Sequence, residues 1–172
     1  LTIRDNGIGM SRDEVVENIG TIAKSGTREL MKQLKETPNP EATAELIGQF
    51  GVGFYSAFMV ADKVTLVTRR AGEDEATRWS SGGDGSYTLD SAERDDRGTT
   101  ITLHLKPVDE ENGLADFTDF HTLQDVVKKH SDFVAYPIRT EHSREEPVKD
   151  EEGEPIEGKT ETIVEDKTLN SQ

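Results

Sequence analysis

The sequence contains no cysteine, which removes both a disulfide framework and any thiolate metal site. Its histidines are few, and their spacing is not that of metal ligands: they stand at His104, His121, His130 and His142. No apolar run is long enough to span a bilayer, and no signal peptide is recognisable. We therefore predict no metal ligand in this chain, expect no membrane as a partner, and expect a cytoplasmic location.

Basic residues are scarce relative to acidic ones. The 172 residues include 20 Lys and Arg against 35 Asp and Glu, a formal net charge of −15. Nucleic acids and anionic membrane surfaces are bound through basic footprints, so neither is an expected partner. The negative net charge does not exclude binding of a small anion at a locally favourable site.

The pattern of the chain predicts a mix of helices and strands, with strands that are antiparallel because no regular βαβ crossovers join them. The first residue is Leu1 rather than methionine, and it already lies in an alternating, strand-like run, so we expect a piece of a longer protein. Ser11 and Glu14 form a capping box at the start of a helix that places Val15, Val16 and Ile19 on one face. Further expected elements are a short helix with Phe54, Phe58 and Ala61 on one face, strands at 64–70, 99–107 and 133–141, a hairpin at 77–90 and a helix at 114–133. The acidic residues 149–158 are expected to be mobile, and residues 160–166 are a candidate strand pairing back onto 133–141.

The glycine-rich stretch GQFGVGF, residues 48–54, precedes the short helix. Glycine lets a backbone approach an anion closely, and a helix N-terminus offers unpaired N–H groups. The spacing differs from the dinucleotide-binding fingerprint and lacks the Lys-Ser/Thr ending of a P-loop. Two interpretations stay open for this stretch alone: a seat for phosphate, or a tight loop that packs closely on a sheet.

The stretch DNGIGM, residues 5–10, joins a strand to a capped helix and so is not a hairpin turn. A carboxylate at this point would repel phosphate, but it can accept a hydrogen bond from an amino group such as that of adenine. The glycines would let the base come close, and Met10 would supply a soft apolar wall. The alternative is that Asp5 is only a local acceptor within the turn.

Taken in order, DNGIGM, GTIAKSGT and IGQFGVGFYSAF resemble the nucleotide-binding domain of the Hsp90 chaperones, and most of all their bacterial branch, the high-temperature protein G type. The resemblance runs over residues 1–140. It implies an α+β fold: a two-layer α/β sandwich of the Bergerat (GHKL) ATPase type, with a mostly antiparallel sheet covered by helices and incomplete at the N-terminus. Residues 141–172 would then be an acidic hairpin or linker toward a middle domain.

The resemblance also implies residue roles. Asp5 would accept from the adenine amine, Gly9 and Met10 would line the base pocket, and Thr99 would complete the adenine site, partly through water. A lid from about residue 20 to 53 would close over ATP. The residues implied at the lid and phosphates are Asn18, Lys24, Gly48, Gly51, Val52, Gly53 and Phe54. The alternatives are simpler structural roles. Met10 and Phe54 would be core residues, Thr99 an ordinary strand residue and Lys24 a solvated helix end.

For the parent protein, the resemblance implies a homodimeric ATPase that binds ATP/ADP and Mg²⁺ and assists non-native client proteins through conformational cycling. The glutamate that activates water and the asparagine that holds Mg²⁺ belong, in the family, to an earlier helix. We therefore expect that this chain alone does not hydrolyse ATP, and no residue in it is assigned as catalytic or as a metal ligand. The alternatives are another GHKL ATPase, of the topoisomerase or mismatch-repair type, and a non-enzymatic binding module.

Overall fold

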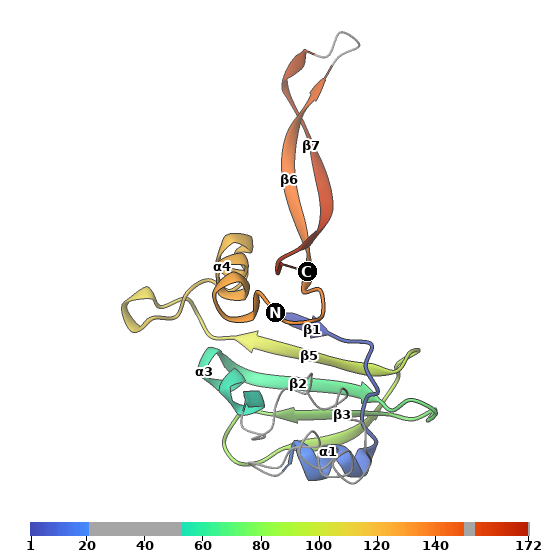
Figure 1. The fold of residues 1–172 in the computed structure, drawn as a ribbon. Helices are drawn as coiled ribbons and strands as arrows, with labels where there is room; N and C mark the ends of the chain where they lie inside the picture. Colours follow the sequence, from blue (N-terminus) through green and yellow to red (C-terminus); the bar gives the residue numbers. More distant parts are fainter. Residues whose placement is uncertain (21–52, 150–153, 172) are drawn as a thin grey trace. The chain divides into compact units, whose positions relative to one another are not determined.

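The computed structural model describes residues 1–20, 53–149 and 154–171 (Figure 1). The chain divides into two compact units, Leu1–Ala115 and Asp116–Gln172.

The first unit is built on a sheet of five strands: β1 (Thr2–Arg4), β2 (Ala61–Arg69), β3 (Ala76–Ser81), β4 (Thr88–Ala92) and β5 (Gly98–Leu105). Their order across the sheet is β1-β5-β2-β3-β4, and every pairing is antiparallel. The antiparallel arrangement, the hairpin within 77–90 and the strands at 64–70 and 99–107 are thus confirmed, within a few residues at their ends. Because β5 pairs with β1 in antiparallel fashion, the start of β5, at Thr99, lies beside Asp5, which follows the end of β1.

Short helices complete this unit: α1 (Arg12–Asn18), η2 (Gly53–Ser56), α3 (Ala57–Val60) and η3 (Glu110–Asn112). The predicted capping box is confirmed, since the Ser11 hydroxyl accepts from the Glu14 N–H and Glu14 accepts from the Ser11 N–H. Ala61, expected to share a helical face with Phe58, instead takes extended backbone angles and begins β2. The helix is therefore shorter than predicted.

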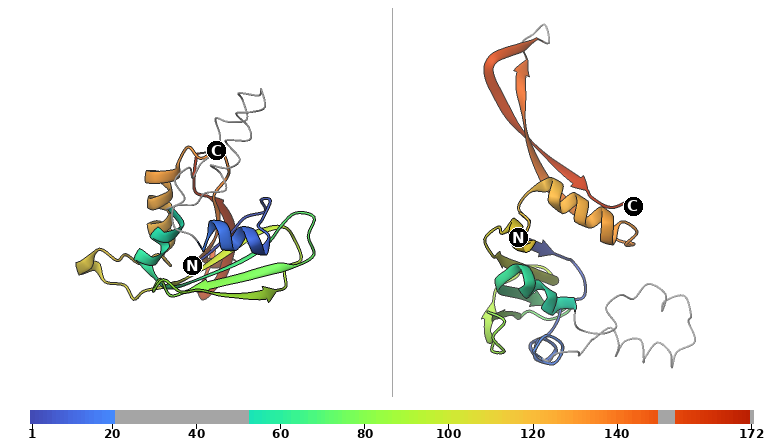
Figure 2. Two further views of the ribbon diagram at one scale, coloured as in Figure 1. Left: turned by 90° about the horizontal axis from the view of Figure 1, so that it is seen from below. Right: turned by 90° about the vertical axis from the view of Figure 1, so that its left-hand side faces the viewer.

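The core lies on one face of the sheet. Along β2, Val64 and Leu66 point to this face, as expected for alternate strand residues, and they pack with Trp79, Leu103 and Val15. Helices α1 and α3 cover the same face (Figure 2). Val16 was expected to lie with Val15 but is 39% exposed, because neighbouring helix positions are about 100° apart and only one can face the sheet.

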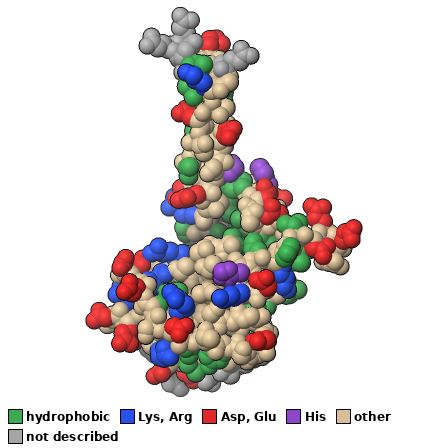
Figure 3. All heavy atoms as spheres, turned by 180° about the vertical axis from the view of Figure 1, so that it is seen from behind, with side chains coloured by type: hydrophobic (Ala, Val, Ile, Leu, Met, Phe, Trp, Pro, Cys, Tyr) green, Lys and Arg blue, Asp and Glu red, His purple; other side chains and the backbone are tan. Residues whose placement is uncertain are grey.

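The opposite face of the sheet is polar. Its hydroxyl groups pair across strands, Thr2 with Thr102 and Thr65 with Ser80, each at 3.4 Å. Seen from behind, the middle of this unit shows few apolar side chains (Figure 3). The sheet therefore buries one face only, as antiparallel sheets often do.

The second unit contains α4 (Phe120–Ser131) and a two-stranded hairpin of β6 (Arg139–Lys149) and β7 (Pro155–Thr168). Helix α4 begins later than the predicted residue 114, because the Asp119 carboxylate caps it by accepting from the Thr122 N–H at 2.7 Å. Residues 160–166 do pair back, but onto 141–147 rather than mainly onto 133–141. Residues 155–158 belong to β7, whereas 150–153 lie outside the described residues.

The strand predicted from residue 133 begins only at Arg139, and Asn170 explains the difference. Its side-chain amide donates to the carbonyls of Val134 and Tyr136 and accepts from the Ile138 N–H at 2.8 Å. These backbone groups are therefore satisfied by one buried side chain and need no partner strand.

Candidate functional site

Asp5 lies directly after β1, in the turn that leads to α1, and its side chain is exposed. Its Oδ1 accepts two backbone hydrogen bonds, from the Gly7 N–H at 2.9 Å and from the Thr99 N–H at 3.0 Å. Its own N–H donates to the Thr99 carbonyl at 2.9 Å. Within the described ranges, the second carboxylate oxygen, Oδ2, accepts no hydrogen bond. The carboxylate is thus fixed through Oδ1, and Oδ2 has no hydrogen-bond partner among the described residues.

Gly9 lets this turn approach the end of β2. Its φ of +68° favours glycine, and a Cβ at this position would lie 1.9 Å from the Arg69 carbonyl oxygen. The neighbouring Ile8 carbonyl accepts from the Ala71 N–H at 2.7 Å. Gly9 therefore has a structural reason to be glycine that is independent of any ligand.

Thr68 is the buried residue that connects the parts of the site. Its hydroxyl accepts from the Met10 N–H at 2.9 Å, lies 3.0 Å from the Thr99 hydroxyl and lies 3.2 Å from the Gly98 carbonyl. It is fully buried. It joins Met10 and Thr99, two predicted site residues that are far apart in the sequence.

The hydrogen-bond capacity of Thr68 also orients Thr99. A hydroxyl has one proton and two lone pairs. If Thr68 donates to the Gly98 carbonyl, it must accept from both Met10 and Thr99. The Thr99 hydroxyl then accepts no hydrogen bond from a described residue, although Thr99 is buried.

Thr68 was not among the predicted site residues. The signal was the alternation of Val64, Leu66 and Thr68 on the inward face of β2, where a hydroxyl takes the third apolar position. A buried hydroxyl needs hydrogen-bond partners, so it indicates a polar neighbour at that end of the strand.

Two other predicted residues, Asn18 and Phe54, lie in the same unit but do not bond to Asp5. Asn18 ends α1, and Phe54 in η2 packs edge-on against Trp79 with ring centroids 5.4 Å apart. Phe54 and Met10 both pack on the core, as the core interpretation of these residues requires. Gly53, at the start of η2, is exposed.

The remaining predicted residues, Lys24, Gly48, Gly51 and Val52, lie outside the described residues, as does nearly all of the lid expected at about 20–53. The residues that flank this segment do meet: the Tyr55 hydroxyl donates to the Ile19 carbonyl. Burial, with a smaller contribution from Tyr87, raises the pKa of Tyr55 and keeps this hydroxyl protonated as a donor.

No group of three His, Asp or Glu side chains in the described part of the chain is placed to hold a metal ion. Nor is any helix in that part long and apolar enough to cross a membrane.

Comparison with known proteins decides the family. Residues 1–113 match the sequence profile of a family described as histidine kinase-, DNA gyrase B-, and HSP90-like ATPase. The chain belongs to this family. The α+β fold predicted for such an ATPase, with its antiparallel sheet, is confirmed.

The HSP90-like character is supported by similar full-length proteins. The chain is 58% identical over 172 residues to Chaperone protein HtpG of Mycobacterium bovis (strain BCG / Pasteur 1173P2). It is 57% identical to the proteins of the same name from Mycobacterium ulcerans (strain Agy99), over 171 residues, and Mycobacterium avium (strain 104), over 175 residues. Each match covers 99% of this chain and 26% of the relative, so the chain spans about a quarter of their length. The predicted resemblance to the bacterial Hsp90 branch is confirmed.

Proposed function

We propose that this chain is the nucleotide-binding part of an ATP-dependent molecular chaperone. The observation that carries the proposal is the Asp5 carboxylate, which is held through Oδ1 by two backbone N–H groups and leaves Oδ2 open. A site of this kind accepts from a donor on a ligand, and the 6-amine of adenine is such a donor. Family membership supplies the expectation of ATP.

Each part of the site then has a role in binding. Asp5 reads the adenine amine, and Thr99, oriented through Thr68, completes the polar contacts around the base. Gly9 and Met10 form the wall of the base pocket, because the turn that carries them is held against the end of β2. Asn18, Lys24, Gly48, Gly51, Val52, Gly53 and Phe54 are proposed for the lid and the phosphates.

Hydrolysis in the parent protein needs a positioned base and a metal-held phosphate. The described residues offer no cluster suited to a metal, so we assign no step to Mg²⁺ through them. We propose that an upstream segment supplies both groups, that the chain alone does not hydrolyse ATP, and that residues 141–172 lead toward a further domain. We also propose that the parent is a cytoplasmic homodimer that acts on non-native client proteins.

Calorimetric titration of the full-length protein with ADP and with GDP, each with magnesium, tests this proposal. Binding of ADP without binding of GDP supports an adenine-reading site. Equal binding would retain a phosphate-binding loop and refute the role of Asp5. A folded protein that binds neither would favour the non-enzymatic module.

A further inference from the structure

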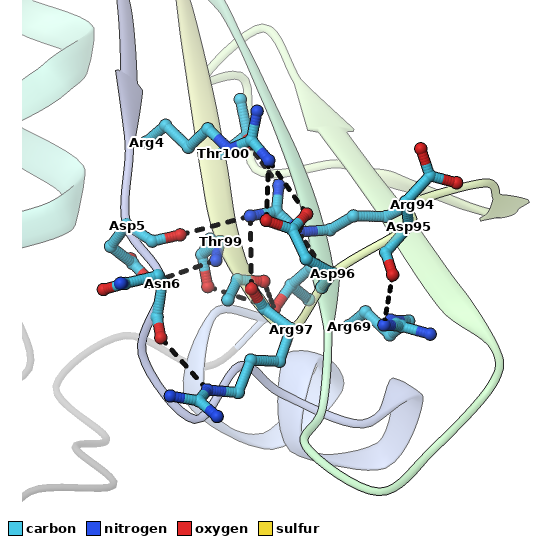
Figure 4. A network of polar contacts seen from close by, with 12 residues as sticks. Arg4, Asp5, Asn6, Arg69, Arg94, Asp95, Asp96, Arg97, Thr99 and Thr100 are labelled. Carbon is cyan, nitrogen blue, oxygen red and sulfur yellow. Dashed lines mark hydrogen bonds and ion pairs between the residues drawn. The ribbon is translucent and has the colours of Figure 1, made fainter.

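The loop between β4 and β5 is hydrogen-bonded to the turn that carries Asp5. Its residues 93–97, ERDDR, are all charged. Three successive residues bond to this loop: the Arg4 side chain, at the end of β1, donates to the Asp96 carboxylate, and the Asp5 and Asn6 carbonyls in the turn accept from Arg94 and Arg97 (Figure 4). The loop therefore bonds to the turn backbone at two successive carbonyls.

Arg94 is the buried member of this loop, with a side chain only 7% exposed. Its Nε donates to the Asp96 carbonyl at 2.9 Å, its Nη1 donates to the Thr100 hydroxyl, and its Nη2 donates to the Asp5 carbonyl at 3.1 Å. The Asp96 carboxylate lies 3.8 Å from Nε and balances the charge. A buried guanidinium is costly unless its donors are used, and here its rigid fork bonds to the Asp96 carbonyl, the Thr100 hydroxyl and the Asp5 carbonyl.

Arg94 completes the fixing of Asp5 in space. The Asp5 N–H and Oδ1 both bond to Thr99, and Nη2 of Arg94 holds the carbonyl at the other end of the residue. Gly98 gives the turn room for this approach, since a Cβ there would lie 2.3 Å from the Asp5 carbonyl oxygen. With its N–H, its carbonyl and one carboxylate oxygen all held, Asp5 can present Oδ2 in one direction.

We propose that Arg94 is a positioning residue for base selectivity: without touching the nucleotide, it sets the direction in which Asp5 presents Oδ2 to the adenine amine. This inference rests on the proposed function. Binding groups must be held within about 0.5 Å of their productive geometry, so a turn loosened by loss of Arg94 should weaken ADP binding through Asp5.

The experiment is a double-mutant cycle in the full-length protein, with ADP affinity measured by calorimetry. We expect Arg94→Gln to weaken ADP binding about tenfold, as when one hydrogen bond is lost. In the Asp5→Asn background the same change is expected to cost less than about twofold, because the carboxylate that Arg94 directs is already gone. Arg94→Lys should recover part of the affinity, since an ammonium can still donate to the Asp5 carbonyl but cannot span all three partners.

The matched control is Arg78→Gln on β3, which removes the same charge from an exposed side chain without a bond to any described residue. It should leave ADP affinity unchanged. Equal losses from Arg94→Gln with and without Asp5 would overturn the inference and reduce Arg94 to a stabiliser of the loop, as would unchanged affinity in a folded Arg94→Gln protein. If Arg94→Gln does not fold, Arg94→Lys is used in the same cycle, with the same expectation of coupling. Failure of the unmodified protein to bind ADP would instead refute the proposed function, and the inference with it.

Discussion

The backbone N–H of Thr99 donates to Oδ1 of Asp5 at 3.0 Å, although 94 residues separate the two in sequence. The antiparallel pairing of β1 with β5 produces this contact, because it places the end of one strand beside the start of the other. The residue proposed to read the base and the residue proposed to complete the pocket are therefore held together by hydrogen bonds between two elements.

Asp5→Asn should abolish the preference for adenine while leaving the fold intact. The Asn carbonyl can take the place of Oδ1 and still accept from Gly7 and Thr99, whereas its NH₂ would replace Oδ2 and face the adenine amine donor to donor. The loss of one charged hydrogen bond, about 1.5–3 kcal/mol, predicts an ADP affinity about 10- to 150-fold weaker. Calorimetry measures the affinity, and circular dichroism reports the fold. Unchanged ADP affinity would contradict the role of Asp5.

Thr68→Val should destabilise the protein by about 1–3 kcal/mol, because the part-buried N–H of Met10 and the buried hydroxyl of Thr99 both lose their bond to Thr68. Thr65→Val on the opposite face of the same strand is the matched control, since its hydroxyl makes one 3.4 Å contact with Ser80. The control should stay within about 0.5 kcal/mol of the unmodified protein. Urea unfolding measures the free energy of unfolding of both variants. Equal losses from the two substitutions would refute the role of the Thr68 hydroxyl in joining Met10 to Thr99.

Gly9→Ala should be much more costly than Gly72→Ala. Both glycines have positive φ, at +68° and +85°, but no atom lies near a Cβ at Gly72. Gly72→Ala then measures the backbone cost alone, about 1–2 kcal/mol. Gly9→Ala adds the collision with the Arg69 carbonyl, about 1–3 kcal/mol more. If chemical denaturation gives the same loss for both, the turn does not need its close approach to β2.

The ion pair between Arg4 and Asp96 should make stability depend on pH at the acid end. The hydrogen bond from Arg4 lowers the pKa of Asp96 below its ordinary 3.8. A carboxyl with a lowered pKa in the folded state stabilises fully above its unfolded pKa, and this contribution is lost as the pH falls through the folded value. Unfolding curves from about pH 6 down to about pH 2 should therefore show that the unmodified protein and Asp96→Asn converge in stability. A difference that stays constant over this range would contradict the ion pair.

Local patterns in the sequence predicted the features that depend on neighbouring residues. The capping box of Ser11 and Glu14 and the alternation along β2 needed only a few residues to be recognised, and both are confirmed. The strand-to-helix turn that carries Asp5 and Gly9 was also predicted, because a capped helix rather than a second strand follows the glycines.

Features that depend on distant residues were missed. Thr68 and Arg94 acquire their roles only when β5 lies between β1 and β2, and the strand order is not visible in a local pattern. The prediction of a strand at 133–138 was wrong for the same reason. The side chain of Asn170, more than thirty positions later, forms hydrogen bonds with the backbone groups of this segment. In each case a side chain bonds to backbone groups that are distant in the sequence: Thr68 to Met10, Arg94 to Asp5 and Asn170 to Ile138.

The most direct test of the account compares ADP with purine riboside diphosphate, which lacks the 6-amine, on the full-length protein and on Asp5→Asn. If Asp5 reads the amine, the unmodified protein should prefer ADP by about tenfold or more, and the preference should vanish in the variant. The same preference in both proteins would show that another group recognises the base, and would contradict the account.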